Sequence, residues 1–275
     1  MNRFNTTKEE LAKLSSEFNS EALPLLDKFY NTSFWILLDK KVSKKIIKQT
    51  YYEAIEYCDK TKAHADWQSW MHRIWMREIH DFYAPKENDT QSIFDFIDFV
   101  ELNLNEAKAL FSNDKLLSCS IESEIINSLN KMPSVLRIPL ILKEIHSLNY
   151  EKIAELIDVP DGVIATRIYR ARKLFFLFLV GSFNYNKRKE ISLPDNFNPI
   201  IFEKRRCALF VDGELNETQV SEFSKVIEAK NEYKSEIFIQ EEINKLLRNL
   251  SLSSSRTKKI KSKIERKAIK RFRNS

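Results

Sequence analysis

Apolar residues recur every three or four positions along most of the chain, which is the period of an α-helix that buries one face. The segments 18–38, 40–58, 67–83 and 121–132 show this period most clearly. The chain has only three glycines among 275 residues, whereas strand-rich folds need many turn residues. The pattern therefore predicts an all-α protein.

Interruptions of the helical period divide the chain into segments. We predict a helical domain at 1–84, an acidic linker at 85–119, a second helical domain at 120–182, a linker at 183–201, a helical extension at 202–250 and a basic tail at 251–275. Apolar residues within the acidic linker indicate that parts of it form a short helix and dock. Pro133 ends the helix before it, and Pro139 either kinks its helix or sits in the first turn.

Two short helices separated by turn residues are predicted between Tyr150 and Phe175. Turn formers lie at Asp158 to Gly162. The second helix buries an apolar stripe and leaves a polar and basic set, Thr166, Arg167, Arg170, Arg172 and Lys173. Such a helix-turn-helix with a basic exposed face suits readout of the DNA major groove. An ordinary helical hairpin with a solvated face also fits this pattern.

The net charge of +6 is unevenly distributed along the chain. The last 20 residues carry ten Lys or Arg and a single Glu265, so the rest of the chain sums to −3. The body is therefore not a uniformly cationic nucleic-acid binder, and any contact with DNA is expected to be a local stripe.

Other kinds of chemistry find little support in the sequence. Cys58, Cys119 and Cys207 are isolated, which argues against a disulfide framework or a cysteine zinc site. The histidines have no partners placed for a catalytic triad or metal site, and there is no glycine-rich phosphate loop. We expect no enzymatic activity and no cofactor. With no long apolar run and no signal core, the chain is expected to be soluble and cytoplasmic.

The string "MPSVLRIPLILKEIHSLNYEKIAELIDVPDGVIATRIYRARKLF", residues 132–175, resembles the C-terminal promoter-reading domain of bacterial sigma factors of the extracytoplasmic-function type. That family has a Leu-Pro start, an Arg four residues on, a Ser-Tyr-x-Glu-Ile-Ala helix and a Gly-Thr-Val-Lys-Ser-Arg-x-x-Arg-Ala-Arg recognition helix. The segments 46–57 and 67–82 are similar in layout to the family's N-terminal module.

The resemblance implies a sigma factor that directs RNA polymerase core to promoter DNA and has no catalytic residues. It assigns the upstream promoter element to Arg137, Tyr150, Gly162, Ala165, Thr166, Arg167, Arg170 and Arg172. It assigns the melted element to Lys62, His64, Trp67, Trp70, Arg73 and Arg77, although the tryptophans also suit a helical core. It assigns polymerase docking to Ile46, Ile47, Gln49 and Thr50.

Lys44, Lys45 and Lys48 stand where the family's docking helix is usually acidic. A reversed charge at a docking surface penalises the usual partner. This departure keeps a second interpretation open, in which a sigma-derived DNA-binding or interaction protein regulates transcription without initiating it.

The string "ALFVDGELNETQ", residues 208–219, resembles the opening of the small helical domain of zinc-type anti-sigma factors. The zinc site itself is missing, because no histidine follows His146 and only Cys207 lies in this segment. The resemblance implies a metal-free inhibitory domain fused in cis, so that the anti-sigma partner is intramolecular, with a separate anti-sigma partner as the alternative. A helical extension that adds stability or a partner surface fits the pattern equally.

The basic tail spaces Ile260, Ile264, Ala268 and Phe272 by four residues. A helix there would have a thin apolar stripe in a basic coat. Such a helix suits DNA phosphate, an acidic protein surface or an anionic membrane. Docking onto the acidic linker and a merely solvated tail are the other interpretations.

Overall fold

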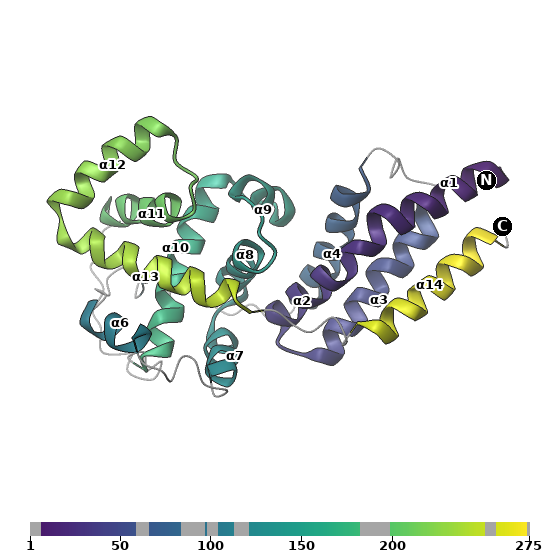
Figure 1. The fold of residues 1–275 in the computed structure, drawn as a ribbon, viewed down its shortest axis with the longest axis horizontal. Helices are drawn as coiled ribbons and strands as arrows, with labels where there is room; N and C mark the ends of the chain where they lie inside the picture. The colour runs from purple at the N-terminus through teal and green to yellow at the C-terminus, as the bar shows by residue number, and fades with distance from the viewer. Residues whose placement is uncertain are drawn as a thin grey trace. The chain divides into compact units, whose positions relative to one another are not determined.

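The computed structural model describes residues 7–58, 66–83, 97, 104–112, 121–181, 199–250 and 257–273. Every regular element in these ranges is a helix, so the predicted all-α class is confirmed for the described part of the chain. The chain divides into two compact units, one of residues 1–86 with 251–275 and the other of residues 87–250 (Figure 1). None of the described helices is both long and apolar enough to cross a membrane.

The first unit contains the N-terminal helices α1 (Lys8–Glu17), α2 (Leu26–Leu37), α3 (Lys40–Tyr57) and α4 (Trp67–Tyr83). A π-helical turn at Phe18–Ala22 and a 3₁₀ turn at Leu23–Leu25 connect α1 to α2. Asp39 caps α3, because its carboxylate accepts hydrogen bonds from the backbone N–H groups of Lys41 and Val42.

The C-terminal helix α14 (Lys258–Arg273) also belongs to the first unit, where it packs on α1 and α3 (Figure 1). The predicted apolar stripe is confirmed, since Ile260, Ile264, Ala268 and Phe272 are all buried. The sequence pattern did not identify the partner of this stripe. It is the pair of helices α1 and α3, which lie more than 200 residues earlier in the chain.

Aromatic rings from distant parts of the chain meet in the core of the first unit. The ring of Phe18 lies 6.2 Å from Tyr51, 6.1 Å from Trp67 and 6.0 Å from Phe272, measured between centroids. Edge contacts of this kind add to the free energy gained by burying the rings. The π-helical turn therefore supplies the ring around which α3, α4 and α14 pack.

The second unit joins the predicted second domain and the extension. Its helices are α6 (Leu104–Phe111), α7 (Ile121–Lys131), α8 (Ser134–Glu144), α9 (Tyr150–Ile157), α10 (Asp161–Leu179), α11 (Pro199–Val211), α12 (Glu217–Ala229) and α13 (Asn231–Arg248). Pro133 stands at the N-cap of α8, after the end of α7, and Pro139 lies inside α8 beyond its first turn.

Helix α10 is the centre of this unit. It packs against α7, α8 and α9 of the helix-turn-helix domain and also against α11 and α13 of the extension (Figure 1). Residues Cys207, Phe223, Tyr233 and Ile237 form a smaller core among α11, α12 and α13. The short helix α6, which lies in the predicted acidic linker, packs on α13.

Candidate nucleic-acid interface

Helices α9 and α10 and the turn between them form a helix-turn-helix. Asn149 caps α9, because its side chain accepts a hydrogen bond of 2.9 Å from the backbone N–H of Lys152. Asp158 ends α9 in the left-handed conformation, with φ of 53°. The predicted turn reached Gly162, but α10 already begins at Asp161, so the actual turn is shorter.

Helix α10 buries two neighbouring stripes. The first stripe faces the domain's own core and consists of Ile164, Ile168, Ala171 and Phe175, each with 0% exposure, as the sequence predicts. The second stripe, about 100° further round the helix, is almost equally buried and consists of Ala165, Tyr169, Arg172 and Phe176. Between residues 163 and 177 of α10, partial exposure is limited to four residues. These residues form a ridge and are Val163, Thr166, Arg167 and Arg170.

The extension covers the second stripe of α10. Gln240 of α13 donates a hydrogen bond to the backbone carbonyl of Tyr169, at 3.4 Å. Arg205 of α11 donates to the carbonyl of Gly162 at the first turn of α10, also at 3.4 Å. Helix α11 therefore reaches the end of α10 that a recognition helix presents to base edges.

A buried ionic cluster fixes the extension to α10. The Nη2 of Arg172 lies 2.8 Å from Oδ1 of Asp212, which follows α11, and the Nε of Arg172 donates to Oε1 of Glu144 in α8, at 2.9 Å. All three side chains have 0% exposure. Burial alone lowers the pKa of the Arg172 guanidinium, but the two carboxylates outweigh burial and raise that pKa.

Asp212 also accepts hydrogen bonds from the helix-turn-helix domain and from the extension. Tyr150 at the start of α9 donates its hydroxyl proton to Asp212 at 2.6 Å, and Asn244 of α13 donates at 3.1 Å. Burial, and then the negative charge of Asp212, raise the pKa of Tyr150 well above 10.0. The "DGEL" string, which the sequence offered only as part of a family resemblance, therefore supplies Asp212 as the central acceptor of the contact.

The turn after Asp212 brings a second carboxylate to the same domain. Gly213 has φ of 69°, a left-handed conformation that favours glycine. The chain reverses there, and Glu214 then pairs with Lys143 of α8 at 2.8 Å. A third ionic contact joins Lys173 of α10 to Glu236 of α13 at 3.8 Å, with both side chains nearly completely buried.

The residues assigned to the upstream element fall into two groups. Arg137, Tyr150, Ala165 and Arg172 are buried, with at most 7% exposure. The guanidinium of Arg137 donates to the carbonyl of Leu129 at 2.7 Å. Gly162 is exposed, and Thr166, Arg167 and Arg170 are half-buried on the ridge of α10. In this arrangement the accessible part of the assigned set is Gly162 and the ridge residues Thr166, Arg167 and Arg170.

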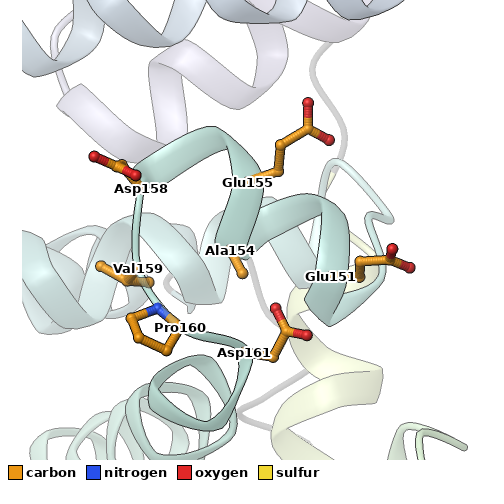
Figure 2. Close-up of a pocket in the computed structure, with 7 residues that line it drawn as sticks. All are labelled: Glu151, Ala154, Glu155, Asp158, Val159, Pro160 and Asp161. Atoms are coloured by element: carbon orange, nitrogen blue, oxygen red, sulfur yellow. The ribbon is translucent and has the colours of Figure 1, made fainter.

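A hollow of about 490 Å³ lies beside the turn of the helix-turn-helix (Figure 2). Its lining residues are Glu151, Ala154, Glu155, Asp158, Val159, Pro160 and Asp161. All four acidic residues are exposed. Carboxylates repel DNA phosphates, so a phosphate contact by this domain is favoured at the cationic ridge of α10 and not at the turn.

The residues assigned to the melted element lie on α4 or outside the described residues. Lys62 and His64 lie outside them. Trp67 is buried and its indole N–H donates to Glu17 at 3.1 Å, which places it in the core. Arg73 is exposed, and Trp70 and Arg77 line one groove of about 710 Å³ between α3 and α4.

Arg77 forms an ion pair with Glu53 across this groove, and that pairing raises the pKa of the guanidinium. The groove also carries the rings of Tyr52 and Tyr57. The structure therefore brings Trp70 and Arg77 together beside two tyrosines of α3, a combination that the sequence pattern did not reveal.

The residues assigned to polymerase docking lie on α3 and are mostly internal. Ile46, Ile47 and Thr50 have at most 3% exposure, and only Gln49 is exposed. The hydroxyl of Thr50 donates to the carbonyl of Ile46 at 2.9 Å. Lys44 and Lys45 are exposed on the same helix, so a partner approaching Gln49 would meet basic side chains on its N-terminal side and Glu53 on its C-terminal side.

The family model and the similar proteins that match this chain both belong to sigma factors. Residues 122–175, which hold α7 to α10 almost completely, match the family model "Sigma-70, region 4". The ECF RNA polymerase sigma-E factor of Haemophilus influenzae is 22% identical over 178 residues, covering 61% of this chain and 93% of the relative. The chain is therefore similar to sigma factors of the extracytoplasmic-function type.

Further proteins that are similar to this chain carry the same name. The sigma-E factors of Escherichia coli and Salmonella typhimurium are each 24% identical to it over 131 residues, covering 46% of this chain and 69% of the relative. No solved structure matches. The match to region 4 ends at Phe175, so α11 to α14 of this chain lie outside it.

Proposed function

We propose that this protein directs RNA polymerase to promoters and that its own C-terminal extension restrains promoter reading. The observation that carries the second part is the burial of Ala165, Tyr169 and Arg172 on α10 beneath α11 and α13. A recognition helix reads bases with exposed side chains. An extension that removes such side chains from solvent competes with DNA for the same helix.

The restraint uses charges that resemble those of the competing ligand. Asp212, Glu214 and Glu236 of the extension pair with Arg172, Lys143 and Lys173 of the helix-turn-helix domain. These carboxylates supply the negative charge that DNA phosphates would otherwise offer to a cationic domain. Release of the extension would therefore make these cations available to promoter DNA.

The strength of the restraint follows from a two-state equilibrium. DNA binds the fraction of molecules in which the extension has moved away, so the apparent affinity falls by that fraction. A preference of about 2.8 kcal/mol for the docked state would weaken promoter binding about 100-fold. Removal of one partner from a buried ion pair costs about 3 to 5 kcal/mol, so loss of Asp212 is sufficient to shift an equilibrium of this size.

Run-off transcription with the core polymerase of the same organism tests this proposal, using the full chain on a promoter library. The variant Asp212→Ala should initiate more strongly than the unchanged protein, because it weakens docking of the extension. Glu228→Ala is the matched control, since Glu228 is an exposed carboxylate of the same extension. Equal initiation by all three proteins would reject restraint in cis.

A second function is favoured by one observation. Lys44 and Lys45 are exposed on α3 where the resemblance expects acidic docking residues. On this alternative the protein regulates transcription without initiating it. Binding to core polymerase separates the two functions, since a protein that neither binds core nor initiates, even as Asp212→Ala, would be a repurposed regulator. As a sigma factor it would work in the cytoplasm, where its partners RNA polymerase and promoter DNA are found.

A further inference from the structure

Helix α14 presents a dense row of cations on the face opposite its buried stripe. The helix holds nine Lys or Arg and one Glu in 16 residues. Its exposed cations are Lys258, Lys259, Lys261, Lys263, Arg266 and Lys270. Like charges four residues apart destabilise an isolated helix. A sequence of this kind therefore needs either a compensating contact within the protein or an anionic ligand.

Contacts with the first unit hold α14 in place. Phe272 packs its ring against Phe18, and the ammonium group of Lys267 lies 4.0 Å from the ring centroid of Tyr52 in α3. The hydroxyl of Thr257, just before the helix, donates to Asp27. The outward cations therefore lie on a helix that is already held in place. Binding a ligand would cost little conformational entropy of the backbone.

Helix α3 extends the basic surface. It packs beside α14, and Lys41, Lys44 and Lys45 are exposed on it. The first acidic residue of α3 is Glu53, so its first three turns are free of carboxylates. Cations from two adjacent helices therefore contribute to the potential on this unit.

We propose that the outward face of α14 binds the phosphate backbone of duplex DNA without regard to sequence. The buried state of Ile260, Ile264 and Phe272 argues against membrane insertion, because an interfacial helix must place its apolar face in the lipid. The exposed face carries Ser262 and Ile269 besides its cations and presents no aromatic side chain among its exposed residues. Single strands are held by stacking on such rings, so duplex phosphate is the better ligand.

This contact is distinct from promoter reading by α10. It lies in the other unit of the chain and needs no base recognition. It would raise the affinity for any DNA and so shorten the search for a promoter. The proposed contact of α14 with DNA does not depend on whether the protein initiates transcription. It can be tested with DNA that has no promoter.

The test compares full-length proteins binding a promoter-free duplex at several salt concentrations. The variant replaces three outward cations of α14, Lys259→Gln, Lys263→Gln and Arg266→Gln. The control makes the same charge change on α12 and α13, Lys225→Gln, Lys234→Gln and Lys245→Gln, at positions that are also exposed. We expect the α14 variant to lower the slope of log affinity against log salt by about 2 to 3, at about 0.9 for each lost phosphate contact.

Equal slopes for the α14 variant and the unchanged protein would overturn the proposal. An equal loss in the control would also overturn it, since net charge alone would then explain binding. A further measurement tests binding of the same proteins to vesicles of anionic lipid. If the unchanged protein bound these vesicles but not the duplex, and the α14 variant lost that binding, the ligand would be a membrane and the proposal would be wrong.

Discussion

Arg172 on the recognition helix and Asp212 in the turn after α11 form an ion pair at 2.8 Å, and neither side chain is exposed. By family resemblance Arg172 belongs to the DNA-reading set. Here it is the residue through which the extension is attached. Under the proposed function, DNA could reach this buried guanidinium only after the extension had moved away, so docking of the extension and a DNA contact at Arg172 would belong to two different states.

Removal of Asp212 should destabilise the second unit. In Asp212→Ala the hydroxyl of Tyr150 and part of the Arg172 guanidinium lose a buried acceptor. We expect the free energy of unfolding to fall by about 2 to 4 kcal/mol, since Glu144 still pairs with Arg172. Urea unfolding measures this loss, and Glu228→Ala should stay within about 0.5 kcal/mol. Similar values for the two variants would mean that the cluster contributes little.

Arg137 and Arg170 should respond to substitution in opposite ways. Arg137 is 7% exposed and donates to the carbonyl of Leu129, so Arg137→Ala should cost about 1.5 to 3 kcal/mol of stability. Arg170 is half-buried on the ridge of α10, so Arg170→Ala should cost about 1 to 3 kcal/mol of promoter affinity. Unfolding curves and DNA titrations in the Asp212→Ala background separate the two effects. A promoter defect in folded Arg137→Ala would contradict this division.

Phe272 should hold α14 on the first unit. Phe272→Ala removes a ring that is 8% exposed and packs against Phe18, and we expect a loss of about 3 kcal/mol. The helix should then be cleaved rapidly by trypsin beside its many Lys and Arg, because its backbone unfolds locally once the helix leaves α1 and α3. Ile269→Ala is the matched control, as Ile269 is 48% exposed. Equal cleavage of both variants would show that the stripe does not anchor the helix.

Stability should fall at alkaline pH. Burial raises the pKa of Tyr51 and Tyr150 well above 10.0, and it also raises the pKa of Cys207 above 9.0 and of Tyr233 above 10.0. Each group stays protonated in the folded state while the unfolded chain ionises. The contribution to stability is therefore complete below about pH 9 and declines above it, by at most about 1.4 kcal/mol per group and pH unit.

Urea unfolding at pH 8, 9 and 10.5 measures this decline. Tyr150→Phe and Tyr233→Phe should each make it shallower, because one ionising group is removed. Tyr57→Phe should leave the decline unchanged, since Tyr57 is 42% exposed. A decline that is the same in all four proteins would assign the alkaline loss to other groups.

The sequence alone determined the helices, the helix-turn-helix and the buried side of each amphipathic segment. Helical period and capping residues are local properties, and so the apolar stripes at Ile164 to Phe175 and at Ile260 to Phe272 could be read from spacing. The family resemblance could be read for the same reason, because its residues lie close together in the chain.

Only the tertiary structure decided which surfaces meet. Asp212 and Arg172 are 40 residues apart along the chain, and Phe272 is far from Phe18 in sequence although their rings are in contact. No periodicity encodes such pairs, since any basic helix face is equally suited to water, to phosphate or to a buried carboxylate. The contacts follow from which apolar stripes remain uncovered once the local helices have formed. Their burial turns part of a predicted DNA-reading set into the anchor of the extension.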